Sequence, residues 1–318
     1  ALAATQPGQN RAFAVTFDGL RGSRGQARHP LPSESSAAKG VAGTAGLSGQ
    51  HLLNALHVIS GQGFVAREYA DAQKYLFGTT NQVIVNGQRG VIDAYSGTFV
   101  PGTGNDGSKY RERGDQNADG RVDSQGMNVE HVWPQSFFNK RAPMKSDVHH
   151  LMITFVYPNG MRAALPFGEV RGPGEYHNRG GAKVGQGVFE PPKEVKGEVA
   201  RRMLYFYVRH HDNNITNGSF SDNFWNNKIE MLLRWNRDFP PSAQERRVND
   251  LGQQFQGNRN PFVDDPSLAD RIGAAALRRQ QNVRAESSRQ ERRRNRSNSR
   301  GRGASVRYPR SRDWVSRR

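Results

Sequence analysis

Three pairs of polar residues between Met127 and Val170 have the types and the spacing to carry out chemistry. The pairs are Glu130-His131, His149-His150 and Asn159-Gly160. A carboxylate and an amide oxygen are ligands that suit a hard cation such as Mg²⁺. An imidazole, whose ordinary pKa is near neutrality, can act as a general base. This combination favours hydrolysis of a phosphate ester.

Each of the central residues has a predicted role. Glu130 and Asn159 would ligate Mg²⁺, His131 would be the base, and Gly160 would allow the backbone to approach a ligand closely. Adjacent residues of a regular strand point to opposite faces, so Glu130 and His131 can serve one site only if the strand ends or kinks there. Pro134 is consistent with such a break. A solvated glutamate and a hydrogen-bonded core histidine remain the alternatives.

Nearby side chains could support this site or contact the phosphate. His149 and His150 lie in a predicted second strand over residues 147–153, where one would face the core and the other the cleft. They would orient the site, or they would be core histidines. Arg162 lies on the same predicted helix face as Asn159 and could contact the scissile phosphate. The rival cations lie between the two strands: Lys140, Arg141 and Lys145.

Residues 115–123 (DQNADGRVD) match part of a calcium-binding loop. The matching positions are Asp115, Asn117, Asp119, Gly120 and Asp123. Gly126 stands where a bidentate glutamate is expected, so the loop would have to borrow a ligand. The same residues favour an Asx-rich turn, and both interpretations stay open. Any calcium bound here would be structural.

Periodicity and turn signals predict the elements that carry these residues. Helical spacing favours helices over residues 49–60, 68–77, 198–211 and 222–236. The last of these would begin after Ser221 or Asp222 as its N-cap. Asn86-Gly87 lies between two β-rich runs and predicts a hairpin. A helix is expected to open at Asn159-Gly160. The fold class is therefore α+β, a mixed α/β single domain.

The positive charge is concentrated near the end of the sequence. The 318 residues carry a formal net charge of +17, and residues 278–318 hold fifteen arginines against three acidic residues. Such a segment cannot bury enough apolar surface to fold alone, so a disordered basic tail is predicted. It would attract phosphate, or it would only aid solubility.

Residues 1–46 are rich in Gly, Ser, Ala and Pro and predict a flexible leader, with at most a short strand over 12–17.

Composition excludes several classes of protein. The chain has no cysteine, which excludes disulfides, thiolate catalysis and cysteine-ligated zinc. It has no run of eighteen apolar residues, so no membrane span is predicted.

The first residues, ALAAT, resemble the small-residue end of a removed signal peptide and predict export. An arbitrary starting point explains them equally well.

Five motifs together resemble the bacterial endonuclease I family, exported nonspecific nucleases of the ββα-metal (His-Me finger) superfamily. The motifs are MNVEHVWPQSFF, SDVHHL, the NGMR helix opening, PFGEV and QGNRNPFVDDP. They occur in the family's order, between about Leu47 and Ile272. The resemblance implies a two-stranded ribbon plus a helix as the active site. It also implies that Glu130 and Asn159 bind the metal and that His131 activates water.

The resemblance further implies cleavage of DNA and RNA to 5′-phosphate and 3′-hydroxyl ends, with Mg²⁺ stabilising the departing oxygen. The chain departs from the family pattern at Ala164, where a second asparagine usually follows the Asn-Gly pair. The inserted loop from which some members supply an arginine at the phosphate is also missing. Arg141 or Arg162 is therefore predicted for that role.

The sequence predicts a secreted, metal-dependent endonuclease of low specificity, with a periplasmic location as the alternative. Its catalytic domain would span residues 47–277, act as a monomer and bind DNA, RNA or both through the phosphate backbone. Mg²⁺ would be the cofactor, with Mn²⁺ or Ca²⁺ as substitutes. One alternative is a ribonuclease or single-strand nuclease of narrower scope. The other is a nucleic-acid-binding or matrix protein on a weakened nuclease scaffold, which Ala164 favours.

Overall fold

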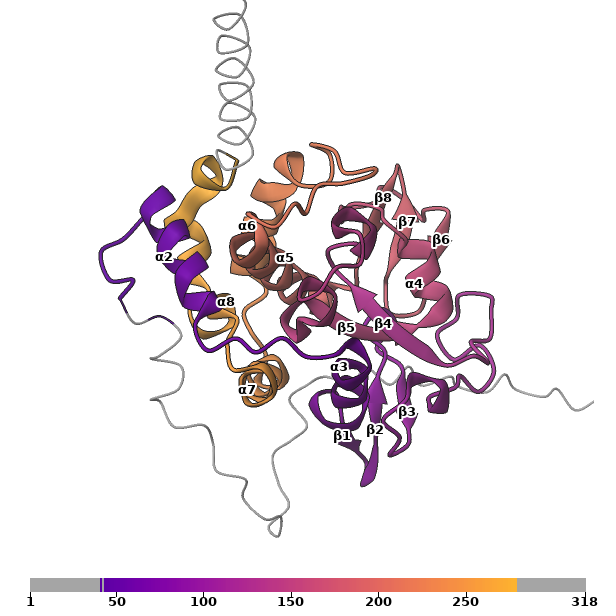
Figure 1. Cartoon of the computed structure of the whole chain (residues 1–318). Coiled ribbons are helices and arrows are strands. Elements are labelled where there is room, and N and C mark those ends of the chain that lie inside the picture. The colour runs from indigo at the N-terminus through magenta and orange to yellow at the C-terminus, as the bar shows by residue number, and fades with distance from the viewer. Residues whose placement is uncertain (1–40, 42, 279–318) are drawn as a thin grey trace, which may run out of the picture.

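A two-stranded ribbon lies in the middle of the molecule, with a group of helices on one side and two small sheets on the other (Figure 1). The computed structural model describes residue 41 and residues 43–278. The predicted strand over 12–17 and the basic tail after residue 278 lie outside the described residues. Within them the α+β fold class is confirmed.

The ribbon and the helix that follows it form one continuous unit. Strand β4 (Met127–His131) pairs antiparallel with β5 (Leu151–Phe155), and α4 (Val156–Arg162) begins directly after β5. The predicted second strand began too early, because Val148–His150 forms a 3-10 turn. The Asp147 side chain accepts a hydrogen bond from the His149 amide and so stabilises that turn instead of an extended chain. Helix α4 also begins before the predicted opening at Asn159.

The helical side is built around α5 (Lys196–His210), which is buried along most of its length. Its neighbours are α2 (Gly49–Gly61) and α6 (Ile229–Asp238). The helices predicted over 49–60 and 198–211 are confirmed. The helix predicted over 222–236 begins later, at Ile229, after a 3-10 turn at Asn226–Lys228. Before that turn the backbone bonds are those of turns and not of an α-helix: the Phe224 amide donates to the Ser221 carbonyl and the Asn227 amide to the Asp222 carbonyl, both at 2.9 Å.

Aromatic packing joins the end of β4 to this helical layer. Trp133 follows β4, is fully buried, and stacks on Phe206 of α5 with ring centroids 5.2 Å apart. Its indole nitrogen donates to the Ile215 carbonyl at 3.0 Å. Such a ring pair adds about 0.5–1.5 kcal/mol beyond the area that it buries. The end of the ribbon is therefore held in place by the core.

The other side of the ribbon carries α3 (Tyr69–Tyr75), which continues into a π-helical turn at Leu76–Thr80. The predicted hairpin is confirmed, since β1 (Val83–Val85) turns through Asn86 and Gly87, both at positive φ, into β2 (Gln88–Ile92). The remaining strands complete two three-stranded sheets: β3 (Phe99–Pro101), β6 (Tyr176–His177), β7 (Lys183–Gly185) and β8 (Val188–Glu190). Further 3-10 turns lie at Gly107–Lys109, Gln135–Phe138, Met144–Ser146 and Lys193–Val195.

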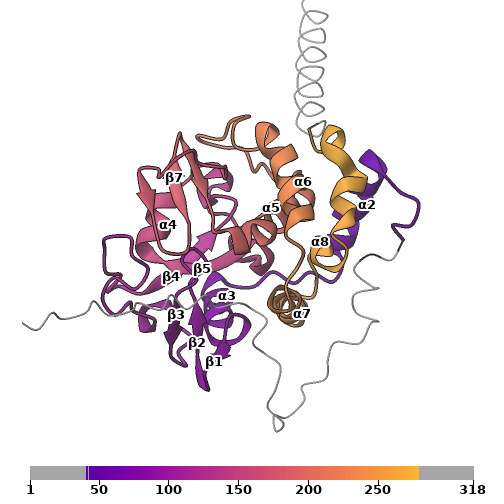
Figure 2. The same cartoon turned by 180° about the vertical axis from the view of Figure 1, so that it is seen from behind.

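The last described helices pack against the first. Helix α7 (Ala243–Gln256) was not predicted, although Ser242 accepts from the Glu245 amide at 3.0 Å and Gly257 follows the last turn at φ +88°. After α8 (Pro261–Asp264), helix 267–278 lies beside α2 in both views (Figure 2). Arg271 donates there to the carbonyls of Thr44 and Leu47. No helix among the described residues is long and apolar enough to cross a membrane.

Candidate active site

Strand β4 and helix α4 bring Glu130 and Asn159 to the same part of the ribbon. Asn128 and Glu130 lie two residues apart on β4 and therefore share a face. The Asn159 amide nitrogen donates to Asn128 Oδ1 at 2.6 Å and to the Val129 carbonyl at 3.3 Å. Because its nitrogen is committed to β4, the orientation of Asn159 is fixed. Among the described residues, none donates a hydrogen bond to its Oδ1.

Glu130 is buried next to the positive charge of Arg162, which donates its hydrogen bonds to other acceptors. Its side chain is 2% exposed, and Oε1 lies 3.1 Å from Arg162 Nη1. That nitrogen directs its protons to the carbonyls of His131 (3.0 Å) and Ala163 (3.2 Å). Oε1 accepts no hydrogen bond of good geometry among the described residues, and this includes the buried Tyr95 hydroxyl that lies near Glu130. Burial raises the pKa of Glu130 above its usual range, and the Arg162 charge opposes that rise.

His131 is held in a neutral form by a backbone carbonyl that fixes which ring nitrogen carries the proton. Its Nε2 lies 3.1 Å from the Lys145 carbonyl, so Nε2 carries the proton and Nδ1 keeps its lone pair. The ring contacts those of Tyr69 (centroids 5.7 Å apart) and His150 (5.4 Å). Burial lowers the pKa of His131 to about 4. At neutral pH this imidazole can accept a proton.

Arg162 is buried with its guanidinium bonded to main-chain carbonyls, and its predicted contact to the scissile phosphate stays a prediction. Its side chain is 1% exposed. Besides the two carbonyls that Nη1 binds, the Val132 carbonyl accepts from Nη2 at 2.5 Å, and the guanidinium lies 4.6 Å from the centre of the Phe167 ring. Arg162 therefore holds the end of β4 and neutralises Glu130. The sequence placed it on the correct helix but could not show which way it is buried.

Arg141 is exposed, yet its guanidinium is also largely committed. Nη2 donates to the carbonyls of Asn213 (2.8 Å) and Asn214 (3.1 Å), and Nε donates to the Phe138 carbonyl at 3.1 Å. These bonds join the loop between β4 and β5 to the loop after α5. None of the acceptors belongs to Glu130, His131 or Asn159, so Arg141 has no visible tie to these three residues.

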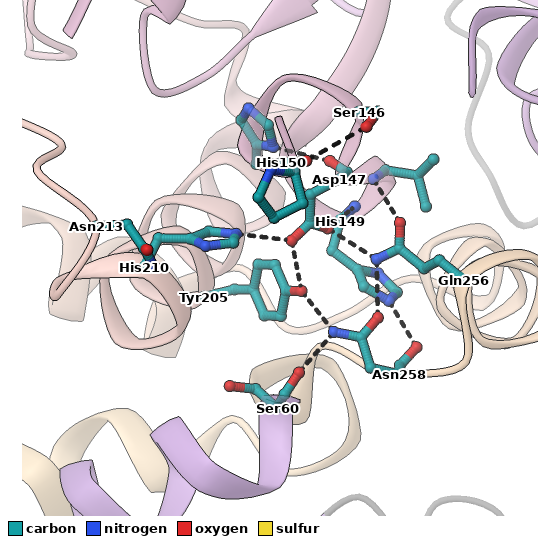
Figure 3. Close-up of polar contacts among 12 residues, drawn as sticks. Ser60, Ser146, Asp147, His149, His150, Tyr205, His210, Asn213, Gln256 and Asn258 are labelled. Carbon is teal, nitrogen blue, oxygen red and sulfur yellow. Dashed lines mark hydrogen bonds and ion pairs between the residues drawn. The ribbon is translucent and has the colours of Figure 1, made fainter. Parts of the chain in front are cut away.

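His149 and His150 belong to a buried polar group centred on Asp147 (Figure 3). We call this group the Asp147 network: Asp147, His149, His150, Tyr205, His210, Gln256 and Asn258. The Asp147 carboxylate is fully buried and accepts from Tyr205 (2.8 Å), His210 (2.9 Å) and Gln256 (2.8 Å). Asn258 donates to the Tyr205 hydroxyl at 2.8 Å. The network joins the start of β5 to α5 and to the turn after α7.

The network keeps a charge in the core. Burial alone would raise the pKa of Asp147, but the hydrogen bond from His210 and the neighbouring histidines lower it well below its usual range. Burial lowers the pKa of both His149, to about 4, and His210. The surroundings of His210 Nδ1 also favour the neutral ring. This nitrogen has no partner among the described residues, so a proton on it would make a buried N–H without an acceptor.

Both predicted supporting histidines are buried, and each bonds a main-chain carbonyl, so a role in orienting the site stays a prediction beside the alternative of core histidines. His149 is 3% exposed and its Nε2 bonds the Asn258 carbonyl at 2.9 Å. His150 is fully buried and its Nδ1 bonds the Asp147 carbonyl at 2.8 Å. Only the edge of the His150 ring reaches the site, through its contact with His131.

The acidic loop is closed by its own backbone. Asp115 accepts from the amides of Asp119 and Gly120 at 3.0 Å each, and Asn117 accepts from the Asp119 amide at 3.0 Å. One oxygen of Asp123, Oδ2, is buried without a partner among the described residues. Within the described part of the chain, no three His, Asp or Glu side chains form a group that could hold a metal. Calcium in this loop stays a prediction.

A family model of the endonuclease I family matches residues 51–267. The chain belongs to this family. Its similar proteins include extracellular ribonucleases of Bacillus amyloliquefaciens, 35% identical over 158 residues, and of Bacillus subtilis (strain 168), 35% identical over 156 residues. Each match covers 46% of this chain and 53% of the relative, so the chain spans about half the length of those relatives. The family resemblance seen in the sequence is thereby confirmed.

The structure adds residues to the site that the sequence reasoning missed. Asn128 could have been found, because it shares a strand face with Glu130 at a spacing of two. Tyr69 and Asp147 left no such signal, since they contact the site only through the folding of distant segments. Ala164, the departure from the family pattern, lies just beyond α4 and packs at the edge of the hydrophobic core.

Proposed function

We propose that this protein is a metal-dependent endonuclease that hydrolyses phosphodiester bonds with low sequence specificity. The observation that carries the proposal is a pair of oxygens that accept no hydrogen bond among the described residues: Oε1 of Glu130 on β4 and Oδ1 of Asn159, whose nitrogen is bonded to Asn128 of the same strand. A buried carboxylate oxygen without a donor costs free energy unless a ligand satisfies it. Glu130 and Asn159 thus fit Mg²⁺, which uses one or two protein oxygens and fills its other positions with water and phosphate.

Different residues of the chain would perform different parts of the reaction. His131, neutral and oriented by the Lys145 carbonyl, would take the proton of a water molecule at Nδ1. Arg162 holds the backbone of His131 and Val132 and keeps Glu130 in place. A bound Mg²⁺ supplies positive charge to the phosphate and to the leaving oxygen. With attack on phosphorus and loss of the 3′ oxygen, the products carry 5′-phosphate and 3′-hydroxyl ends.

The substrate is DNA, RNA or both, bound through the phosphate backbone by a monomer. The names of the extracellular ribonucleases favour a second candidate, a ribonuclease of narrower scope. They also favour export, with a periplasmic location as the alternative. The alternative of a binding or matrix protein has only Ala164 in its favour, and the retained Glu130, His131 and Asn159 speak against it.

A substrate panel tests the proposal. Supercoiled plasmid, single-stranded DNA and a structured RNA are each incubated with the protein and Mg²⁺, Mn²⁺ or Ca²⁺, and with EDTA. Cleavage of all three substrates is expected with Mg²⁺, and ligation of the fragments without kinase treatment checks the 5′-phosphate. Cleavage of RNA alone would support the ribonuclease. Binding without cleavage under every metal would support the binding protein.

A further inference from the structure

Lys145 differs from the arginines near the ribbon in that its charged group has no hydrogen-bond acceptor. Arg162 and Arg141 direct most of their donors to main-chain carbonyls. Among the described residues, no carbonyl or carboxylate is bonded to Lys145 Nζ, and its side chain is half-buried. The ammonium lies instead 4.3 Å from the centre of the Tyr69 ring. An ammonium on an aromatic face keeps its three N–H donors for another partner.

The main chain of Lys145 is fixed next to the predicted base. Lys145 lies in the 3-10 turn Met144–Ser146, and its amide donates to the Arg141 carbonyl at 3.0 Å. Its own carbonyl bonds His131 Nε2 at 3.1 Å. The backbone of Lys145 therefore orients the His131 imidazole. Because this backbone is fixed, the Lys145 side chain also begins at a fixed position next to the imidazole.

Tyr69 is the neighbour that Lys145 and His131 share. It is the first residue of α3, a helix that packs against the turn Met144–Ser146. Its ring lies 5.7 Å from the His131 ring and beneath the Lys145 ammonium. Burial raises the pKa of Tyr69 to about 12, so the ring carries no charge at neutral pH. Tyr69 therefore contacts both the Lys145 ammonium and the His131 ring and holds the two near one another.

We propose that Lys145 binds a non-bridging oxygen of the phosphate on which His131 acts, with Tyr69 as the residue that positions the ammonium. The proposal rests on the nuclease function proposed above. The water oxygen forms the new bond to phosphorus, its proton passes to His131, and the bond from phosphorus to the 3′ oxygen breaks, with that oxygen protonated from solvent. Negative charge grows on the phosphate oxygens during this step, where one donor is worth about 10²- to 10³-fold in kcat.

Three variants test Lys145 directly. Lys145→Met keeps the stem and removes the charge, and Lys145→Arg keeps the charge. Lys193→Met, at an exposed lysine in the turn Lys193–Val195, removes the same charge elsewhere. We expect Lys145→Met to lower kcat on an oligonucleotide by about 10²-fold or more, with KM changed far less. Lys145→Arg should recover most of the loss, and Lys193→Met should stay within about twofold of wild type.

Two variants test Tyr69. Tyr69→Phe retains the ring and should retain kcat, whereas Tyr69→Leu removes the ring and should lower kcat by about three- to thirtyfold. Thermal unfolding shows whether each variant is folded. A second readout omits the metal: fluorescence anisotropy of a labelled oligonucleotide in EDTA should show weaker binding to Lys145→Met than to Lys193→Met.

The outcomes separate this inference from the proposed function. An active wild type in which Lys145→Met and Lys193→Met cleave equally overturns the role of Lys145 and leaves the nuclease intact. A wild type that cleaves no substrate with any metal overturns the nuclease and the inference together. Equal kcat in Tyr69→Leu and Tyr69→Phe, alongside a defective Lys145→Met, removes Tyr69 from the proposal.

Discussion

Two buried polar clusters adjoin the β4–β5 ribbon, and they differ in how their polar atoms are satisfied. In the Asp147 network the buried carboxylate accepts hydrogen bonds from three side chains. In the ribbon site, by which we mean Glu130, His131 and Asn159, no described residue donates a hydrogen bond of good geometry to Glu130 Oε1 or to the Asn159 amide oxygen. The atoms without partners in the Asp147 network are imidazole nitrogens such as His210 Nδ1, which need no partner in a neutral ring.

This difference in hydrogen bonding indicates that the Asp147 network stabilises the fold, whereas the ribbon site is arranged to bind a ligand. Complete satisfaction makes a polar cluster rigid and specific. An unsatisfied carboxylate costs stability and persists where function needs it. The two clusters are joined at one place, the segment 145–150, which supplies Asp147 to the network and the Lys145 carbonyl to His131. Four experiments can break or sharpen this comparison.

Of these four, the largest effect is expected at Glu130. Glu130→Gln should lower the cleavage rate by roughly 10²- to 10³-fold, because the charge that attracts a cation is lost. The free energy of unfolding should fall by at most about 1–2 kcal/mol, because Arg162 loses a buried counter-charge but keeps its carbonyl acceptors, and burial already opposes the ionised form of Glu130. Initial rates and urea unfolding measure the two quantities. A variant that cleaves normally would remove Glu130 from the site.

The opposite pattern is expected at Asp147. Asp147→Asn should lower the free energy of unfolding by roughly 2–3 kcal/mol, because it replaces a charged acceptor shared by three side-chain donors. The rate of the folded variant should fall by less than about tenfold. Asp106→Asn is the matched control, since the Asp106 side chain is exposed and bonds only within its own turn. An Asp147 variant as stable as that control would contradict the structural role.

Mild acid should lower the free energy of unfolding through the Asp147 network, with the loss already measurable between pH 6.5 and 5. The pKa of His149, lowered to about 4, lies below its unfolded value near 6.5. The unfolded chain therefore binds more protons below pH 6.5, and the stability from a neutral His149 is lost as pH falls toward 4. The loss is roughly 2 kcal/mol between pH 6.5 and 5, and His210 shifts in the same direction. Urea unfolding at both pH values checks this, and equal stability would refute it.

The smallest effect is expected in the acidic loop. Burial, with Asp119 and Glu112 nearby, raises the pKa of Asp123 to about 6. A cation at its unpartnered oxygen would relieve that repulsion, so millimolar Ca²⁺ should raise Tm by about 2–4 °C at pH 7, equivalent to roughly 1 kcal/mol. The increase should vanish in Asp123→Asn. Identical melting curves with Ca²⁺ and with EDTA would identify the loop as an Asx-rich turn.

The sequence predicted most of what depends on local patterns. It placed Glu130 on a strand, found the hairpin at Asn86-Gly87, and gave the two most apolar helices their bounds within two residues. It failed at α7, which was not predicted, at the start of α6, which turns precede, and at the start of β5, where the Asp147 side chain bonds the His149 amide. Periodicity does not register such bonds.

The candidate site could be predicted as a set of residue types and not as an arrangement. Nothing local to Arg162 shows that its donors are used by the end of β4, so a phosphate contact was as reasonable as burial. Lys145 was one of three cations between the strands, and only Tyr69, far away in sequence, distinguishes it. The direction of a long side chain depends on tertiary contacts, which a single sequence does not contain.

The most direct test of the central claim compares cleavage by wild-type protein and His131→Ala on the same duplex DNA and the same RNA, with Mg²⁺ and with EDTA. If Glu130 and Asn159 hold the metal and His131 is the base, the wild type cleaves only with Mg²⁺. The His131 variant should then lose about 10²- to 10⁴-fold in rate while remaining folded. Full activity of His131→Ala, or undiminished cleavage by the wild type in EDTA, would contradict the account.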